Sequence, residues 1–174
     1  MALDLGCAQR RADPSTPRLP AWGTMEATNN RNTRVGQMDD RAPHYTITFD
    51  GGSKGNPGKG YGSYELRTCD DRTRLERLDY GDNITNNEAE YRTLIEGLDD
   101  VLRTLRAAEK DPRNYRIRVQ GDSQLVIRQL TGQYGIKHPG MRELHAKAQA
   151  LAAQLGQVEY HWHRREHSVK TLGH

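Results

Sequence analysis

Residues 45–67 read YTITFDGGSKGNPGKGYGSYELR and decide the fold class. Tyr45, Ile47 and Phe49 alternate with threonine, which is the period of a β-strand that buries one face. The strand ends at Asp50, and a glycine-rich segment leads from it into a second alternating run. A phosphate-binding P-loop would lead into a helix and would carry Ser or Thr after Gly-Lys, so this segment is not one. The pattern predicts two antiparallel strands.

The pattern downstream predicts a mixed sheet covered by helices. Apolar residues follow the i, i+3, i+4, i+7 spacing in two long segments, which is typical of helices with one buried face. The expected strands cover residues 45–50, 61–67, 73–80, 115–121 and 158–162, and the expected helices begin near residue 86 and cover 123–130 and 141–155. The first three strands form a meander, and the helical crossover allows the fourth strand to lie parallel to the first.

Residues 1–43 keep neither period for more than a few residues and hold four of the seven prolines. Such a segment buries too little apolar surface to offset its ordering entropy. We therefore expect a disordered tail over residues 1–43 and one domain over residues 44–174. The tail accounts in part for the low hydrophobic content of the chain, which is 34%.

Charge and composition exclude several classes of protein. The chain carries 26 Lys and Arg against 23 Asp and Glu, so its net charge of +3 is not that of a histone-like protein. A nucleic-acid enzyme is still permitted, because phosphate binding needs local rather than net charge. No apolar run approaches the roughly 18–20 residues of a membrane helix, so we expect no membrane partner. Two cysteines cannot build a disulfide scaffold, and we expect a cytoplasmic location.

Acidic residues fall at the ends of the expected strands. Asp50 follows the first strand and Asp122 follows the fourth. If these strands are parallel neighbours, both carboxylates lie at the sheet edge where open α/β sheets bind ligands. The helix that begins near residue 86 brings Glu88 or Glu90 over the same edge. Converging carboxylates repel one another unless cations neutralise them, and their hard oxygen atoms suit Mg²⁺ or Mn²⁺.

Three motifs follow one another on suitable elements: DGGSKGNPG at 50–58, TNNEAEY at 85–91 and GDSQLV at 121–126. In these motifs the chain resembles type 1 ribonuclease H, and most closely the compact branch named reverse transcriptase-like. The resemblance extends from residue 44 to about residue 168. It implies the RNase H-like fold, an α/β architecture in which helices flank a five-stranded mixed sheet whose fourth and fifth strands are parallel.

The resemblance also implies an activity. It is endonucleolytic cleavage of the RNA strand of RNA/DNA hybrids by a monomer, with two Mg²⁺ or Mn²⁺ ions and no organic cofactor. Asp50, Glu90 and Asp122 match the family's catalytic and metal-binding carboxylates, Glu90 because the family pattern is Asn-Asn-x-x-Glu. The family's contacts to the hybrid fall on Ser53, Gly55, Asn56, Thr85, Asn86, Asn87 and Gln124. Some of these contacts would reach 2′-hydroxyls, the groups that distinguish RNA from DNA.

The resemblance breaks at the family's fourth carboxylate, which follows the fifth strand. Leu172 stands at its position, and leucine cannot bind a metal ion. The residues after the strand are also too few for the family's final helix, which we expect to be missing. Three interpretations stay open. Glu166, His167, His174 or water takes the place of the fourth carboxylate, or the chain is a catalytically weakened or inactive module that binds RNA/DNA hybrid. The third is that a frameshift or truncation has removed the family's C-terminal end.

Histidines near the C-terminus offer an alternative from another class. His161 and His163 share one face of the fifth strand, and with His167 they form a candidate zinc site in a protein-interaction module. Zinc would not suit the carboxylates, and the sequence indicates no further ligand for it.

Overall fold

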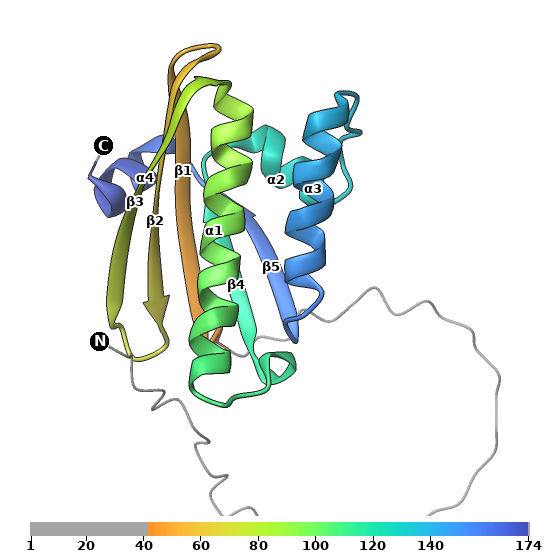
Figure 1. Ribbon diagram of the computed structural model, residues 1–174. Helices are drawn as coiled ribbons and strands as arrows, with labels where there is room; N and C mark the ends of the chain where they lie inside the picture. The colour runs from red at the N-terminus through yellow and green to blue at the C-terminus, as the bar shows by residue number, and fades with distance from the viewer. Residues whose placement is uncertain (1–41, 174) are drawn as a thin grey trace, which may run out of the picture. The chain divides into compact units, whose positions relative to one another are not determined.

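The computed structural model describes residues 42–173 (Figure 1). Its elements follow in the order β1 (Tyr45–Gly55), β2 (Gly58–Thr68), β3 (Thr73–Ile84), α1 (Asn86–Ala107), the 3₁₀ turn η1 (Pro112–Asn114), β4 (Arg116–Gly121), α2 (Gln124–Leu130), α3 (Pro139–Ala152), β5 (Gln157–Trp162) and α4 (Arg165–Leu172). The tail predicted for residues 1–43 lies outside the described residues, except for its last two positions. No helix within residues 42–173 is long and apolar enough to cross a membrane.

The five strands form one sheet in the order β3-β2-β1-β4-β5. β1 pairs with β2, and β2 with β3, in antiparallel fashion, whereas β4 is parallel to both β1 and β5. This confirms the predicted mixed sheet, in which a meander is joined to parallel strands through the α1 crossover. β1 is the central strand, which explains why its first residues are almost all buried.

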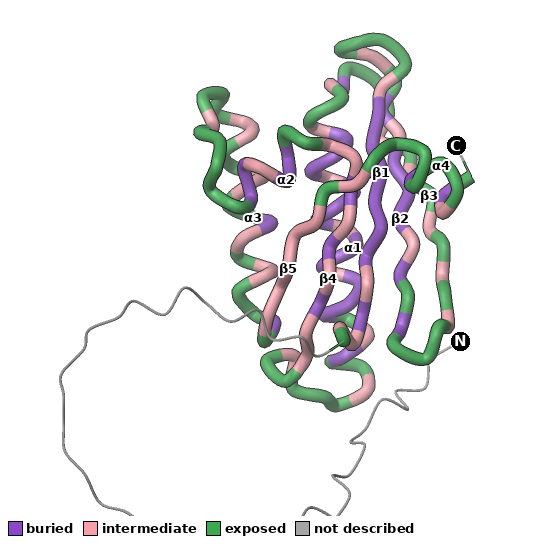
Figure 2. The backbone as a smooth tube through the Cα atoms, turned by 180° about the vertical axis from the view of Figure 1, so that it is seen from behind, coloured by how far each residue is buried: buried purple, intermediate pink, exposed green. Residues whose placement is uncertain are grey.

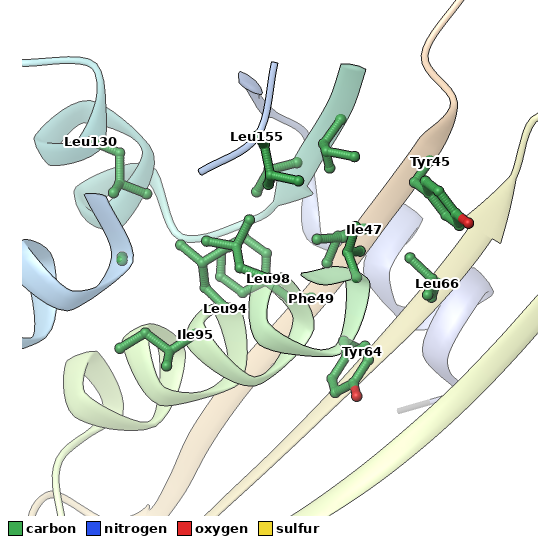
Figure 3. Packing of buried hydrophobic residues seen from close by; sticks show 14 of the residues in the cluster. Tyr45, Ile47, Phe49, Tyr64, Leu66, Leu94, Ile95, Leu98, Leu130 and Leu155 are labelled. Carbon is green, nitrogen blue, oxygen red and sulfur yellow. The ribbon is translucent and has the colours of Figure 1, made fainter. Parts of the chain in front are cut away.

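α1 covers one face of the sheet, and α2 and α3 join it there (Figure 1). The predicted apolar stripe of α1 is buried: Figure 3 shows Leu94 and Leu98 in the same cluster as Ile47 of β1, and all three are fully buried. A buried hydrogen bond adds to this docking, because the Tyr64 hydroxyl of β2 donates to the Asp100 carboxylate of α1 at 3.0 Å. The helix is therefore fixed to the sheet by both apolar and polar contacts.

The glycine-rich segment after Asp50 is a continuous hairpin. β1 runs on to Gly55 and β2 begins at Gly58, so both strands are longer than predicted and end with these two glycines paired. Gly55 has a φ of 99°, a left-handed conformation that residues with side chains rarely adopt. The hairpin brings Ser53 and Asn56 to the first turn of α1.

A final helix is present, so the expectation that it would be missing is wrong. α4 lies on the face of the sheet opposite α1, behind the sheet in Figure 1 and in front of it in Figure 2. Ser168 and Leu172 are buried and stand one turn apart. Gly173 ends the helix in a left-handed conformation, and the Arg77 guanidinium donates to the Leu172 carbonyl at 3.2 Å. These contacts stabilise a helix that its own sequence does not predict.

Leu172→Ala is predicted to loosen α4 from the sheet. The Leu172 side chain is 1% exposed, and truncating a buried leucine costs about 2–5 kcal/mol in a well-packed core. We expect a loss near the lower end, about 2 kcal/mol in the free energy of unfolding, with faster amide hydrogen exchange over residues 165–172. Val169, on the outer side of the same helix at 43% exposure, supplies the control. Val169→Ala should change stability by less than about 0.5 kcal/mol, and equal effects of the two variants would contradict the packing.

Candidate functional site

Three carboxylates converge at one edge of the sheet. Asp50 comes from β1, Glu90 from the second turn of α1, and Asp122 from the residue after β4. Each contributes an oxygen atom, and these atoms all lie within 4.8 Å of one another. The structure therefore brings together the three acids that the motifs single out, and it places Glu90 rather than Glu88 with the two aspartates.

The end of β4 opens the space in which Glu90 meets Asp50. The last residue pair between β1 and β4 is Phe49 with Gly121, so β1 has no β4 neighbour beyond that point. α1 enters there, against Gly51: a Cβ atom on Gly51 would lie 2.5 Å from the backbone of Ala89 and Glu90. The Gly51 backbone N–H donates a hydrogen bond to the Glu90 carboxylate. Only glycine at position 51 allows an approach this close.

A capping box at the start of α1 separates the roles of the two glutamates. Thr85 is the N-cap residue, and its hydroxyl accepts a hydrogen bond from the Glu88 backbone N–H. The Glu88 carboxylate in turn accepts from the Thr85 backbone N–H and hydroxyl, both at 2.8 Å. These hydrogen bonds lower the pKa of Glu88. The Glu88 carboxylate is thus hydrogen-bonded within the capping box, and Glu90 is the glutamate that faces the aspartates.

Burial and like charge destabilise the ionised form of Glu90. The residue is 8% exposed, and its Oε2 atom has no hydrogen-bond partner within residues 42–173. Burial raises the pKa of Glu90 well above its usual range, and the neighbouring Asp50 and Asp122 raise it further. The nearest recorded cation is Arg165, whose Nη1 lies 3.8 Å from Asp122 Oδ2. A divalent cation among these oxygens would relieve the repulsion, so the three acids fit a hard metal ion.

The predicted substrate-contacting residues lie on the β1–β2 hairpin, at the start of α1 and at the start of α2. The Ser53 backbone N–H donates to Asn86 Oδ1 at 2.8 Å, and the Asn86 backbone N–H donates to Asn56 Oδ1 at 3.2 Å. These bonds connect the hairpin to the first turn of α1. The remaining predicted contacts are Gly55 at the hairpin turn, Thr85 and Asn87 on either side of Asn86, and the exposed Gln124 at the start of α2.

The predicted auxiliary residues do not join the carboxylates. Glu166 and His167 are both exposed on α4, and His174 lies outside the described residues. The His167 ring packs against His163, with 4.7 Å between ring centroids. Within residues 42–173 the three carboxylates are the single group suited to a metal ion, so the histidines form no zinc site there. Leu172, at the position of the family's fourth carboxylate, is the last residue of α4, and its side chain is buried.

Two residues near the site were not predicted to belong to it. Trp162 is 48% exposed, and its indole N–H donates to the Asp122 carbonyl at 3.0 Å. Arg165 lies beside the Asp122 carboxylate. The parallel pairing of β4 with β5 places Trp162 opposite Gly121, one residue before Asp122. The predicted parallel pairing of the fourth and fifth strands allows this register, so it could have indicated that Trp162 lies near Asp122.

The described region is similar to known proteins. A family model described as reverse transcriptase-like matches residues 48–170. A bifunctional protein of Mycobacterium tuberculosis is 44% identical over 118 residues, which make up 67% of this chain and 30% of that protein. The solved N-terminal RNase H domain from the same organism, fused to maltose-binding protein, has a TM-score of 0.64 at 35% identity and covers 74% of this chain and 88% of that chain.

Two further similarities extend the comparison. Ribonuclease HI of Halobacterium salinarum is 36% identical over 112 residues, which make up 64% of this chain and 52% of that protein. A ribonuclease H1 solved in complex with an RNA/DNA hybrid has a TM-score of 0.65 at 28% identity, covering 72% of this chain and 89% of that chain. The chain thus spans 30% and 52% of the lengths of the two curated relatives.

The raised pKa of Glu90 predicts how stability depends on pH without metal. A carboxyl group whose pKa is raised by folding contributes stability below its unfolded pKa, near 4.5, and loses it as pH rises through the folded value. In chelator, the melting temperature of the unmodified chain should therefore fall as the pH rises above about 4.5. The melting temperature of the Glu90→Gln variant should fall less over the same pH range, because the amide does not titrate. Asp99→Asn, at a half-buried position of α1 that pairs with Arg103, is the control, and parallel pH curves for all three proteins would contradict the prediction.

Gly51→Ala is predicted to push α1 away from β1. Its Cβ would meet the backbone of Ala89 and Glu90, which has no flexible side-chain end to move aside. We expect urea unfolding to show a loss of about 1–3 kcal/mol, the usual cost of overpacking. Gly135→Ala is the matched control, since nothing lies within 4 Å of the added atom. A Gly51→Ala protein as stable as this control would contradict the close approach.

Proposed function

The chain belongs to the reverse transcriptase-like family of RNase HI-type proteins, and from this membership we propose that it is a metal-dependent endoribonuclease acting on RNA/DNA hybrids. It cleaves the RNA strand by hydrolysing phosphodiester bonds. The observation that carries the proposal is the convergence of Asp50, Glu90 and Asp122, the acids of the three family motifs. A cytoplasmic, monomeric protein without an organic cofactor is part of the same proposal.

The three carboxylates would hold two divalent cations, Mg²⁺ or Mn²⁺. When bound, such ions activate water and stabilise the negative charge on the departing 3′ oxygen. The protein supplies the negative charge that binds them, in a site where burial has already removed most of the water around Glu90. The Gly51 N–H and the docked α1 hold the Glu90 carboxylate in place before any ion arrives.

Neutral side chains around the carboxylates would hold the hybrid. Ser53, Asn56 and Asn86 are connected by backbone-to-side-chain hydrogen bonds, so the hairpin and α1 present one preformed polar surface. Their amide and hydroxyl groups are suited to 2′-hydroxyls, which identify the RNA strand. By the family resemblance, Thr85 and Asn87 at the N-terminus of α1 would bind a phosphate of the DNA strand. Gln124 would add a contact from α2.

The position of Leu172 supports a second candidate function. A buried leucine replaces the family's fourth carboxylate, and neither Glu166 nor His167 joins the other three acids. A site with three carboxylates carries less negative charge for a second cation. The second candidate is therefore a module that binds RNA/DNA hybrid but cleaves it slowly or not at all.

A hybrid-cleavage assay in Mg²⁺ and in Mn²⁺ tests the proposal. Asp50→Asn and Asp122→Asn should each lower the cleavage rate at least about a hundredfold, because metal ions contribute several kcal/mol to such reactions and 1.4 kcal/mol is a factor of ten. Asp99→Asn, at a half-buried aspartate on α1 that pairs with Arg103, should leave the rate unchanged. If the unmodified chain binds the hybrid yet cuts it with neither ion, the second candidate function is the correct one.

A further inference from the structure

A basic pocket lies beside the carboxylates, between the β1–β2 hairpin, β3 and α4. Its volume is about 520 Å³. Four cationic side chains line it, together with one acid and one tyrosine: Lys54, Lys59, Arg77, Arg165, Asp79 and Tyr61. The cations exceed the acid by three charges, whereas the neighbouring group of Asp50, Glu90 and Asp122 is wholly acidic.

Three of the four cations of the pocket make recorded contacts, Lys59 with Asp79, Arg77 with Leu172 and Arg165 with Asp122. Lys59 pairs with Asp79 at 3.2 Å, and both side chains are well exposed. Arg77 donates to the Leu172 carbonyl at 3.2 Å. Lys54 is exposed near the end of β1 and forms no ion pair within residues 42–173. Because four cations and one acid line the pocket, an anion entering it would meet an excess of positive charge.

The pocket and the carboxylates are adjacent. Arg165 lines the pocket and also lies 3.8 Å from Asp122. On β1, Asp50 pairs with Ser63, and Gly52 pairs with Tyr61 of the pocket. Two residues along a strand correspond to about 7 Å. Phosphates of one strand rise about 3.4 Å per nucleotide along a duplex axis, so the pocket lies one or two nucleotides from a phosphate at the carboxylates.

Tyr61 gives the pocket a flat aromatic wall. A Cβ atom at Gly52 would lie 2.5 Å from the Tyr61 hydroxyl oxygen, so the ring lies directly over the Gly52 backbone. A tyrosine ring over a glycine offers an uncharged surface against which a sugar can pack while the surrounding cations contact its phosphate. Cations beside a polar aromatic surface are typical of sites that bind a nucleic-acid backbone.

We propose that this pocket binds a backbone phosphate of the nucleic-acid strand that crosses the carboxylates, one or two nucleotides from the phosphate that is cleaved. The inference rests on the proposed function and adds a subsite to it. It also accounts for how an acidic centre attracts a polyanion, because Lys54, Lys59, Arg77 and Arg165 supply local positive charge before metal ions are considered. A phosphate contact of this kind is independent of base sequence.

Binding measured without cleavage tests the pocket. The parent is Asp50→Asn, titrated against a labelled RNA/DNA hybrid by fluorescence anisotropy at salt concentrations from about 50 to 200 mM, the range in which phosphate contacts respond strongly. Lys54→Gln should weaken binding and reduce the slope of log K against log salt by about one. Lys54→Gln combined with Lys59→Gln should reduce it by about two. Lys110→Gln, an exposed lysine just after α1, is the control and should match the parent.

The possible outcomes separate the two proposals. If the Lys54 and Lys59 variants bind the hybrid with the parent's affinity and salt slope, the pocket proposal is overturned and the proposed function stands. If the parent binds no hybrid at any salt concentration, both are overturned. Lys54→Glu is a further test in case the neutral substitution has a small effect. Because it reverses the charge, it should weaken hybrid binding more than Lys54→Gln does. Melting temperatures equal to the parent's would show that the variants are folded.

Discussion

The backbone of β1 at Gly51 touches the backbone of α1 at Ala89 and Glu90, and the candidate site depends on this contact. It is possible because β4 ends beside Phe49 and leaves the next part of β1 open on that side. It also requires a residue without a side chain, since a Cβ atom would lie 2.5 Å from helix backbone. Core packing of Leu94 and Leu98 holds the helix against this point. The same packing that stabilises the fold therefore sets the position of Glu90.

This constraint brings together groups that repel one another. Glu90 is buried between two aspartates, and its ionised form is disfavoured by burial and by their charge. The protein stabilises the arrangement with the Gly51 hydrogen bond, the capping box of Thr85 and Glu88, and the nearby Arg165. The packing of α1, together with these contacts, offsets the electrostatic cost. A site held this way is ready for cations, because binding them removes a repulsion that is already present.

Particular residues show how far the sequence predicts this protein. Alternating and helical periods located the sheet and its long helices, and strand ends located Asp50 and Asp122. The choice between Glu88 and Glu90 needed the family pattern, although Thr85 stands three residues before Glu88, the spacing of a capping box. α4 escaped prediction because its stability comes from contacts distant in sequence, mainly Arg77 and the sheet under Leu172. Such tertiary contacts have no local signature.

Position 172 shows how anchoring and metal binding compete for one residue. In a helix of eight residues, Leu172 is the large apolar side chain that is fully buried, and Ser168 offers little apolar surface. Unless a metal ion bound it, a carboxylate at this position would be buried without a partner or would draw the end of the helix into solvent. The start of the same helix carries Arg165, which lies beside Asp122 and lines the basic pocket. Leu172 thus provides no metal ligand, but its burial anchors α4. This anchoring holds Arg165 beside both the carboxylates and the basic pocket.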